Sequence, residues 1–252
     1  MKLFSRKILI VAGVLLSHPD AVGQYTTYGK IEYERKVNLI RQIEDMTTEE
    51  NKIWMDKMKS SAPKFTTSYF DLQFNGDASI YKPGRESEQT TKMMWMNPPA
   101  AENVVFTDLK NNHVAAAKLI FEERFLVEDS LRKLEWKIMD EIRVIADYKC
   151  RKAVSRICDS VYVVAFYTED IPASGGPEMF GGLPGMIMQI AVPRLHTTWI
   201  ATKVDIIPPR PEDLKKPSKG KKVNQEELYT NLNKSISKWG NWAHRTIWWS
   251  ML

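Results

Sequence analysis

Alternating apolar and polar residues mark the first segment with a clear structural pattern. In the stretch GKIEYERKV, the apolar residues Ile31, Tyr33 and Val37 share one face, and most of the charged residues share the other. A period of two is typical of a strand with one buried face. We therefore expect a half-buried strand over residues 28–37.

Further strands are expected at short intervals along the middle of the chain. Asn75-Gly76, which separates the alternating stretches FDLQF and SIY, is a strong hairpin signal. Strand-like patterns then follow at Val104–Leu109, Val114–Leu126, Leu131–Ile138, Ile142–Ala153, Val161–Thr168, Met186–Val192 and Thr197–Ile207. Strands at this spacing, joined by short polar turns, predict an antiparallel meander. The absence of regular strand–helix alternation argues against a Rossmann-like fold.

One short helix is expected beside the sheet. Thr47 and Glu50 have the spacing of a capping box, and apolar residues recur at helical spacing after them, which predicts a helix from Thr48 to Lys59. The expected fold class is therefore mainly β (α+β). It combines an antiparallel, curved meander sheet or a partly closed barrel with this short helix and a C-terminal helix.

The chain after residue 207 is expected to form two further parts. Residues 208–223 are rich in Pro and Lys, which predicts an exposed linker after a β-rich domain over residues 24–207. Residues 224–252 are predicted to form an amphipathic helix, capped by Asn224, and a Trp-rich tail. The apolar stripe of this helix is Leu228, Leu232, Ile236 and Trp239.

Residues 1–23 have the three parts of a secretory signal peptide. A basic start, MKLFSRK, precedes the apolar run ILIVAGVLL and a polar end with small residues. This run is short for a bilayer core of about 30 Å, so cleavage before Gln24 is favoured over a permanent anchor. We therefore expect an exported protein that is periplasmic or associated with the outer membrane.

Composition and charge narrow the class of protein. The 252 residues are 43% hydrophobic and 27% charged, with a mean hydropathy of -0.36, which excludes a polytopic membrane protein. Loss of the signal peptide lowers the net charge from +5 to +3, with 33 basic and 30 acidic residues. With so small a charge on an exported chain, nucleic acid is not an expected partner.

The most distinctive segment is GGPEMFGGLPGMIMQI. Within it, Leu183-Pro184-Gly185-Met186 suits a type II turn, because proline fixes φ at the second position and glycine accepts positive φ at the third. The glycines also permit a ligand or partner to approach the backbone closely. Two interpretations stay open: a structural corner, and a backbone surface that contacts a ligand or partner.

At this segment the sequence resembles the GLPGLI family of exported proteins of Gram-negative bacteria. The hexapeptide stands here as Gly182-Leu183-Pro184-Gly185-Met186-Ile187, with Met in place of the second Leu. The resemblance extends over most of residues 29–207, through the stretches GKIEY, SIY, WK, YKC, AFYT, DIP, GP and FG. It implies export and a β-rich fold, and it implies no activity and no catalytic residues. Cys158 and the Trp-rich tail are not features associated with that family.

These observations predict a noncatalytic envelope protein that binds an apolar ligand or an outer-membrane or periplasmic protein partner. The tail can also contact a membrane surface peripherally, since Trp is favoured at interfaces. No cofactor and no metal site are expected. The candidate ligand- or partner-binding residues are Phe180, Gly181, Gly182, Leu183, Pro184, Gly185, Trp242, Trp248 and Trp249.

A periplasmic hydrolase is the first alternative. Cys150 lies among basic residues that favour a thiolate if the thiol is exposed. A thiol enzyme also requires a base, and the candidates are His113, His196 and His244, in no recognisable signature. A carboxylate-dependent version would use Glu169 and Asp170, close to the glycine-rich loop.

The two cysteines are expected to remain separate thiols. Cys150 and Cys158 are eight residues apart, which along one strand corresponds to about 26 Å, whereas a disulfide requires Cα atoms within about 7 Å. An intermolecular bridge remains open.

Copper binding is the second alternative function. Thioether sulfurs are soft ligands for Cu(I), and two groups of methionines could supply them. These are Met93, Met94 and Met96, and Met186 and Met188.

Overall fold

The computed structural model describes residues 25–87, 99–158, 160–239 and 241–252, without the side chains of residues 237, 241 and 242. The expected signal peptide and Met93, Met94 and Met96 lie outside the described residues. Across the described residues, no helix has the length and apolar character required to cross a membrane.

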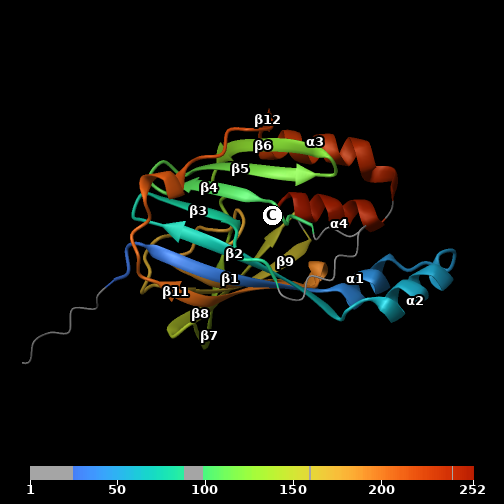
Figure 1. Cartoon of the computed structure of the whole chain (residues 1–252), viewed down its shortest axis with the longest axis horizontal. Coiled ribbons are helices and arrows are strands. Elements are labelled where there is room, and N and C mark those ends of the chain that lie inside the picture. Colours follow the sequence, from blue (N-terminus) through green and yellow to red (C-terminus); the bar gives the residue numbers. More distant parts are fainter. Residues whose placement is uncertain (1–24, 88–98, 159, 240) are drawn as a thin grey trace, which may run out of the picture.

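The described strands form one open, curved sheet of twelve strands (Figure 1). Their order is β12-β6-β5-β4-β3-β2-β1-β11-β10-β9-β8-β7, so β12 and β7 are the two edges. All neighbours are antiparallel except β12 and β6, which are parallel. The strands are β1 Gly29–Asn38, β2 Phe65–Phe74, β3 Ala78–Pro83, β4 Val104–Asp108, β5 His113–Ile120, β6 Glu123–Ser130, β7 Lys137–Ile145, β8 Tyr148–Ile157, β9 Val161–Thr168, β10 Met186–Val192, β11 Thr197–Asp205 and β12 Lys221–Val223. The expectation of a mainly β, curved meander is confirmed.

The alternation in β1 determines which face of the sheet is buried. Ile31, Tyr33 and Val37 are almost fully buried, and in the antiparallel register Ile31 lies opposite Leu72 and Tyr33 opposite Phe70. Arg35 occupies the same inward face and is also completely buried. The concave side of the sheet therefore contains the main core and at least one buried charge.

Two expected strands are divided by turns with positive φ. Ala146 and Asp147, at φ 47° and 69°, separate β7 from β8 inside the predicted strand 142–153. Phe121, at φ 57°, lies between β5 and β6 inside the predicted run 114–126. These turns lack the Gly and Asn-Gly signals that mark positive φ in a sequence, so the pattern alone missed them. By contrast, the hairpin at Asn75-Gly76 is confirmed between β2 and β3.

The helix predicted from Thr48 to Lys59 is present as α2 Lys52–Ser61, which begins four residues later than expected, and a further helix, α1 Leu39–Met46, precedes it. The Asn38 side chain caps α1 by accepting a hydrogen bond from the backbone N–H of Arg41 at 3.1 Å. The capping box expected at Thr47 is wrong. Thr47 is the C-cap of α1, and its N–H donates to the carbonyl of Glu44.

The C-terminal segment consists of α3 Gln225–Ile236, the short 3-10 helix η3 Ser237–Trp239 and α4 Asn241–Ser250. Asn224 caps α3 as predicted: its Oδ1 accepts from the N–H of Glu227 at 2.8 Å, and the Glu227 carboxylate accepts from the N–H of Asn224. Leu228, Leu232 and Ile236 are buried as predicted. Trp239 is wrongly placed in that stripe, since it is 54% exposed.

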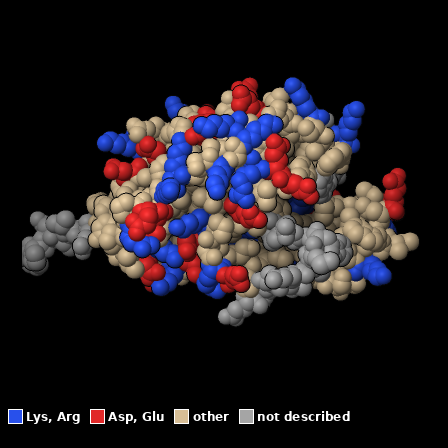
Figure 2. All heavy atoms as spheres, turned by 45° about the horizontal axis from the view of Figure 1, so that its top comes forward, with Lys and Arg blue, Asp and Glu red and all other residues tan. Residues whose placement is uncertain are grey.

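Residues 208–223 lie against the body rather than extending freely from it. They contain the short 3-10 helix η2 Pro211–Leu214, followed by the strand β12, which pairs with β6. The Glu128 carboxylate on β6 forms ion pairs with Lys216 at 2.6 Å and Lys222 at 3.4 Å. Most side chains of this segment are exposed, as expected of a linker, but its backbone extends the sheet. Figure 2 shows basic and acidic side chains interspersed over the visible face, in keeping with the small net charge.

The last residues of the chain are held within the curve of the sheet. Figure 1 shows the C-terminal end close to the middle of the molecule, beside β9 and α4. The carbonyl oxygens of Ser250, Met251 and Leu252 accept hydrogen bonds from Lys118 Nζ, Arg132 Nη2 and the backbone N–H of Met179, respectively. The tail is thus fastened to the sheet and to the glycine-rich segment.

Candidate functional site

A cavity of about 300 Å³ lies between α4, α1 and the end of β5. Its lining comes from Gln42 and Met46 of α1, from Pro99, Ala100 and Asn103, from residues 118–121, and from α4. Part of this lining is apolar, including Met46, Leu119 and Ile120. The described lining also contains two cationic side chains, Lys118 and Arg245, and no Asp or Glu. The cavity is therefore apolar along its walls and positively charged at two points.

Lys118 reaches the cavity from β5 and is only 1% exposed. Its Nζ donates a hydrogen bond of 2.9 Å to the carbonyl of Ser250. Burial lowers the pKa of Lys118 to about 8, against an opposing influence of the nearby Glu178 carboxylate. A buried ammonium that relies on one carbonyl has unused capacity to donate hydrogen bonds.

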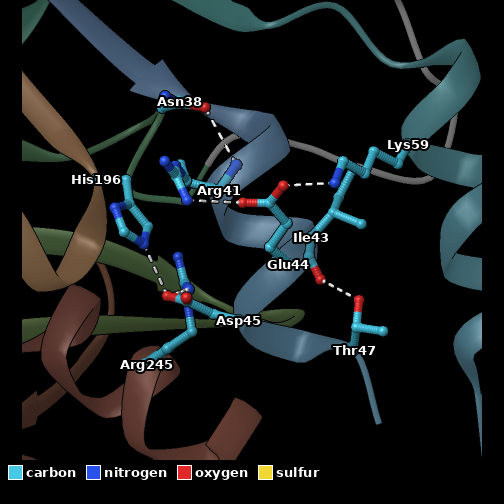
Figure 3. A network of polar contacts seen from close by, with 9 residues as sticks. All are labelled: Asn38, Arg41, Ile43, Glu44, Asp45, Thr47, Lys59, His196 and Arg245. Carbon is cyan, nitrogen blue, oxygen red and sulfur yellow. Dashed lines mark hydrogen bonds and ion pairs between the residues drawn. The ribbon is translucent and has the colours of Figure 1, made fainter. Parts of the chain in front are cut away.

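Arg245 enters the cavity from α4 and is 7% exposed (Figure 3). Its Nη1 pairs with the Asp45 carboxylate at 2.8 Å, and the same Asp45 oxygen lies 2.8 Å from His196 Nε2. Its Nη2 is buried and has no hydrogen-bond partner within the described part of the chain. Burial lowers the pKa of Arg245, and Asp45 opposes that effect. Asp45 therefore orients the guanidinium but satisfies only one of its ends.

Figure 3 also shows how the first helix fixes Asp45. Asn38 caps the N-terminus of α1, and Thr47 Oγ1 donates back to the carbonyl of Ile43. Glu44 forms ion pairs with Arg41 and with Lys59 of α2. These contacts hold α1 in place, so that Asp45 faces Arg245 and His196 rather than solvent alone.

Trp249 of α4 also lines the cavity. It is 4% exposed, and its ring centroid lies 5.9 Å from that of Trp199 on β11. The guanidinium of Arg35 lies 5.6 Å from the Trp249 ring. The indole Nε1 is buried and finds no acceptor among the described residues. Buried Trp N–H groups usually have a partner, so this donor is unusual.

A second buried charged group lies next to the cavity. Glu178 is 2% exposed, has a backbone φ of 54°, and accepts a hydrogen bond of 2.8 Å from Asn103, which lines the cavity. Burial raises the pKa of Glu178, while Lys118 and Arg35 act in the opposite direction. Positive φ in a residue other than glycine is uncommon and is often found at functional sites.

The buried Lys118 predicts a rise of stability with pH. Because its folded pKa of about 8 lies below the unfolded value, the unfolded state binds more protons between about pH 8 and pH 10, and stability increases with pH in that window. The measurement is urea unfolding of wild type and Lys118→Met at pH 7.5 and at pH 10. From the lower to the higher pH, we expect the free energy of unfolding of wild type to increase by on the order of 2 kcal/mol relative to that of Lys118→Met. A difference between the two proteins that stays flat or falls over this range contradicts the assignment.

The glycine-rich segment predicted as a binding surface is largely buried. Phe180, Gly181, Leu183 and Gly185 are buried, whereas Gly182 and Pro184 are exposed. The carbonyl of Gly181 accepts a hydrogen bond of 2.9 Å from Trp136 Nε1. Gly181 and Gly182 also line a separate groove of about 1060 Å³ beside residues 131–134 and the start of α3. The exposed part of the motif is thus confined to two residues.

The predicted type II turn at Leu183–Met186 is wrong in its hydrogen bonding. The N–H of Gly185 donates to the carbonyl of Leu183, and the N–H of Met186 donates to the carbonyl of Ile171 instead of closing the turn. Gly185 has a φ of 157°, and a Cβ at this position would lie 2.0 Å from the carbonyl oxygen of Thr168. The glycine is therefore required by a close backbone approach between the segment and the end of β9.

The three tryptophans predicted as binding residues have different positions. Trp249 lines the cavity, and Trp248 is partly buried, with its ring 6.2 Å from His244 and 5.5 Å from the Arg194 guanidinium. The side chain of Trp242 lies outside the described part of the structure. The fold brings the tail to the glycine-rich segment, since Leu252 accepts a hydrogen bond from Met179.

The residues of the alternative functions are arranged unfavourably for those functions. Cys150 is fully buried, its Sγ donates to the carbonyl of Tyr148, and burial raises its pKa to about 12. The expectation that neighbouring basic residues favour a thiolate therefore fails, because it assumed an exposed thiol. Within the described residues no histidine hydrogen-bonds to Cys150. Cys150 and Cys158 do not form a disulfide with each other, as expected.

Two further candidates are equally unsupported as reactive groups. Glu169 and Asp170 are both exposed. Met186 and Met188 are completely buried in the core. In the part of the chain that is described, no three His, Cys, Asp or Glu side chains gather in a way that could hold a metal ion.

Sequence reasoning missed the two cations of the cavity and the buried Glu178. The available signals were weak. Lys118 interrupts the apolar run 114–126, and Arg245 stands four residues before Trp249, one helical turn away. A single charge in an apolar stretch is ordinarily explained by exposure, and only the packing of α4 against β5 reveals that these two are buried together.

Comparison with known protein families gives one short match, to a family without a described activity. A model of a family described as "Protein of unknown function (Porph_ging)" matches residues 155–189, a range that includes the Gly182–Ile187 hexapeptide. No curated protein matches the sequence. The chain thus shows similarity to an uncharacterised family over one segment.

Solved structures agree with the fold. PNGF-II in its P21 crystal form has a TM-score of 0.51 and 19% identity over 78% of this chain. The C2 form has a TM-score of 0.51 and 18% identity over 88%. In both cases the match covers 32% of PNGF-II, so the chain spans about a third of that protein. An uncharacterized conserved protein from Thermus thermophilus matches over 79% of this chain and 91% of its own, at 6% identity and a TM-score of 0.38, too low to bear on the fold.

Proposed function

We propose that this is a noncatalytic, exported envelope protein that binds a small, largely apolar molecule in the cavity beneath α4. The observation that carries the proposal is the cavity itself: about 300 Å³, with apolar walls and a few polar groups. Small-molecule sites in proteins have this character and begin at about this volume. The N-terminal signal-peptide pattern supports the exported location.

The tail's position favours a ligand over a protein partner docked on the tryptophans. Trp249 packs against Trp199, so a partner would have to pull it from the core before contacting it. A thiol-dependent hydrolase is disfavoured by the burial and raised pKa of Cys150. Peripheral contact with a membrane through the tail would be restricted to its less buried side chains.

The ligand is testable by filling the cavity. Ala100 lines it, whereas the neighbouring Ala101 does not, so Ala100→Phe and Ala101→Phe are matched variants. We expect native mass spectrometry of protein purified without detergent to show a bound small molecule in wild type and Ala101→Phe. The Ala100→Phe protein should lack it, because the added ring occupies the ligand's volume. Equal occupancy in all three proteins, or no ligand in any, contradicts the proposal.

A further inference from the structure

We propose that the cavity selects an amphiphilic carboxylic acid, with the acid group held by Arg245 and Trp249 and the alkyl chain along the apolar walls. This inference rests on the proposed binding function and specifies the chemical class of its ligand. Its basis is a pair of buried, unpartnered donors, Arg245 Nη2 and Trp249 Nε1, which belong to two residues that line the same cavity.

The unpartnered donors are energetically unusual. Arg245 is 7% exposed and Trp249 is 4% exposed, so water has little access to either side chain as a whole. A buried donor without an acceptor costs free energy comparable to a lost hydrogen bond, and more when the group is charged. A ligand that brings acceptors to both donors would recover that loss. This requirement favours a ligand group that accepts hydrogen bonds and donates none.

The charge of the lining favours an anion over a neutral acceptor. Lys118 and Arg245 both line the cavity, and the described lining has no carboxylate. Asp45 is engaged with Arg245 Nη1 and with His196. Glu178 is not among the lining residues, and its Oε2 accepts from Asn103. A guanidinium with one free end and an indole N–H from the residue four positions further along α4 can supply the two donors that a carboxylate accepts.

The apolar part of the lining indicates that the rest of the ligand is an apolar chain. Met46, Leu119 and Ile120 line the cavity together with residues 99 and 100. A bare inorganic anion would leave this surface uncovered. For scale, a 150 Å³ apolar cavity holds benzene. A volume of about 300 Å³ therefore has room for on the order of twelve heavy atoms. Octanoate and decanoate are acids of this size.

The test compares an acid with the alcohol of equal chain length. Isothermal titration calorimetry would measure binding of octanoate, 1-octanol and inorganic phosphate to the purified full protein at pH 7. We expect octanoate to bind at least about tenfold more tightly than octanol, the ratio that a charge-assisted hydrogen bond supplies. Phosphate is expected to bind weakly or not at all.

Variants assign the effect to the two donors. Arg245→Met should weaken octanoate binding about tenfold or more and leave octanol binding nearly unchanged. Trp249→Phe deletes only the N–H while keeping an aromatic wall, and it should weaken octanoate several-fold. Arg143→Met, on the exposed strand β7, is the matched control and should bind both ligands as wild type does. A far-ultraviolet circular dichroism melt of each variant checks that it is folded.

A spectroscopic readout does not depend on any variant remaining stable. In a ¹⁵N-correlated NMR spectrum of the wild type, the Trp249 indole N–H should move when octanoate is added and remain unshifted with octanol. The proposed selectivity for an acid is wrong if octanol binds as tightly as octanoate, or if the indole resonance does not shift on addition of octanoate. In either case the proposed binding function still stands. If no acid or alcohol from six to twelve carbons binds, the proposed function fails as well.

Discussion

Gly185→Ala should destabilise the protein by about 3 kcal/mol or more, the upper range for forcing extra atoms into a packed site. The new Cβ would lie 2.0 Å from the carbonyl oxygen of Thr168 and 2.8 Å from its carbonyl carbon. Both clashes are with backbone, which cannot rotate away as a side chain can. Met186 pairs with Thr168 in the register of β10 and β9, so relief requires these two interior strands of the sheet to separate.

Gly76→Ala is the matched control, because a Cβ at this turn position meets nothing within 4 Å. This substitution should change the free energy of unfolding by no more than about 1 kcal/mol. It can increase stability, because alanine lowers the conformational entropy of the unfolded chain. Equilibrium urea unfolding of both variants would measure the difference. If Gly185→Ala unfolds at the same midpoint as Gly76→Ala, the close approach to Thr168 is not a constraint in solution.

Trp249→Ala should cost about 3–5 kcal/mol, the range for removing a large aromatic side chain from a core. The side chain packs against Trp199 and lies near the Arg35 guanidinium. Its loss would also leave the buried Arg35 with one fewer aromatic contact, in a position where Arg35 Nε already has no partner among the described residues. Because natural domains have total stabilities of about 5–15 kcal/mol, this variant should be close to unfolding at 37 °C.

The control for the tail is Lys234→Ala, an exposed position of α3, which should change stability by no more than about 0.5 kcal/mol. Thermal unfolding followed by calorimetry would compare both with wild type. Equal melting temperatures for Trp249→Ala and wild type would mean that the C-terminal helix is not docked inside the sheet, and the cavity that it encloses would be lost with it.

Local sequence patterns were sufficient to predict most of the strands, because the alternation within a strand indicates which of its faces is buried. The alternation of Ile31, Tyr33 and Val37 and the hairpin signal at Asn75-Gly76 are properties of neighbouring residues. The turn at Ala146-Asp147 was missed because its positive φ is imposed by the pairing of β7 with β8. Helix α1 was missed because its eight residues have a charged, irregular sequence.

The cavity was beyond local patterns for a different reason. Its two cations come from β5 and α4, more than a hundred residues apart, and only their packing reveals that both are buried. Arg35 carried the clearest signal, since it occupies an inward position of an alternating strand, and a charge at such a position indicates a buried polar network. The tail tryptophans were singled out correctly as notable residues, but composition alone did not reveal that Trp249 is directed inward.

The place of β1 in the sheet has a consequence for the order of folding. Strands β2 to β6 and β7 to β10 are two runs of sequential neighbours, and each can assemble from short hairpins. The two runs are joined through the pairing of β1 with β11, in a register that places Lys30 opposite Asp205. Closing so long a loop carries a large entropic penalty before its contacts form, so this step should set the folding rate. The two runs of strands should therefore form first, and the sheet should become continuous only when they meet along β1 and β11.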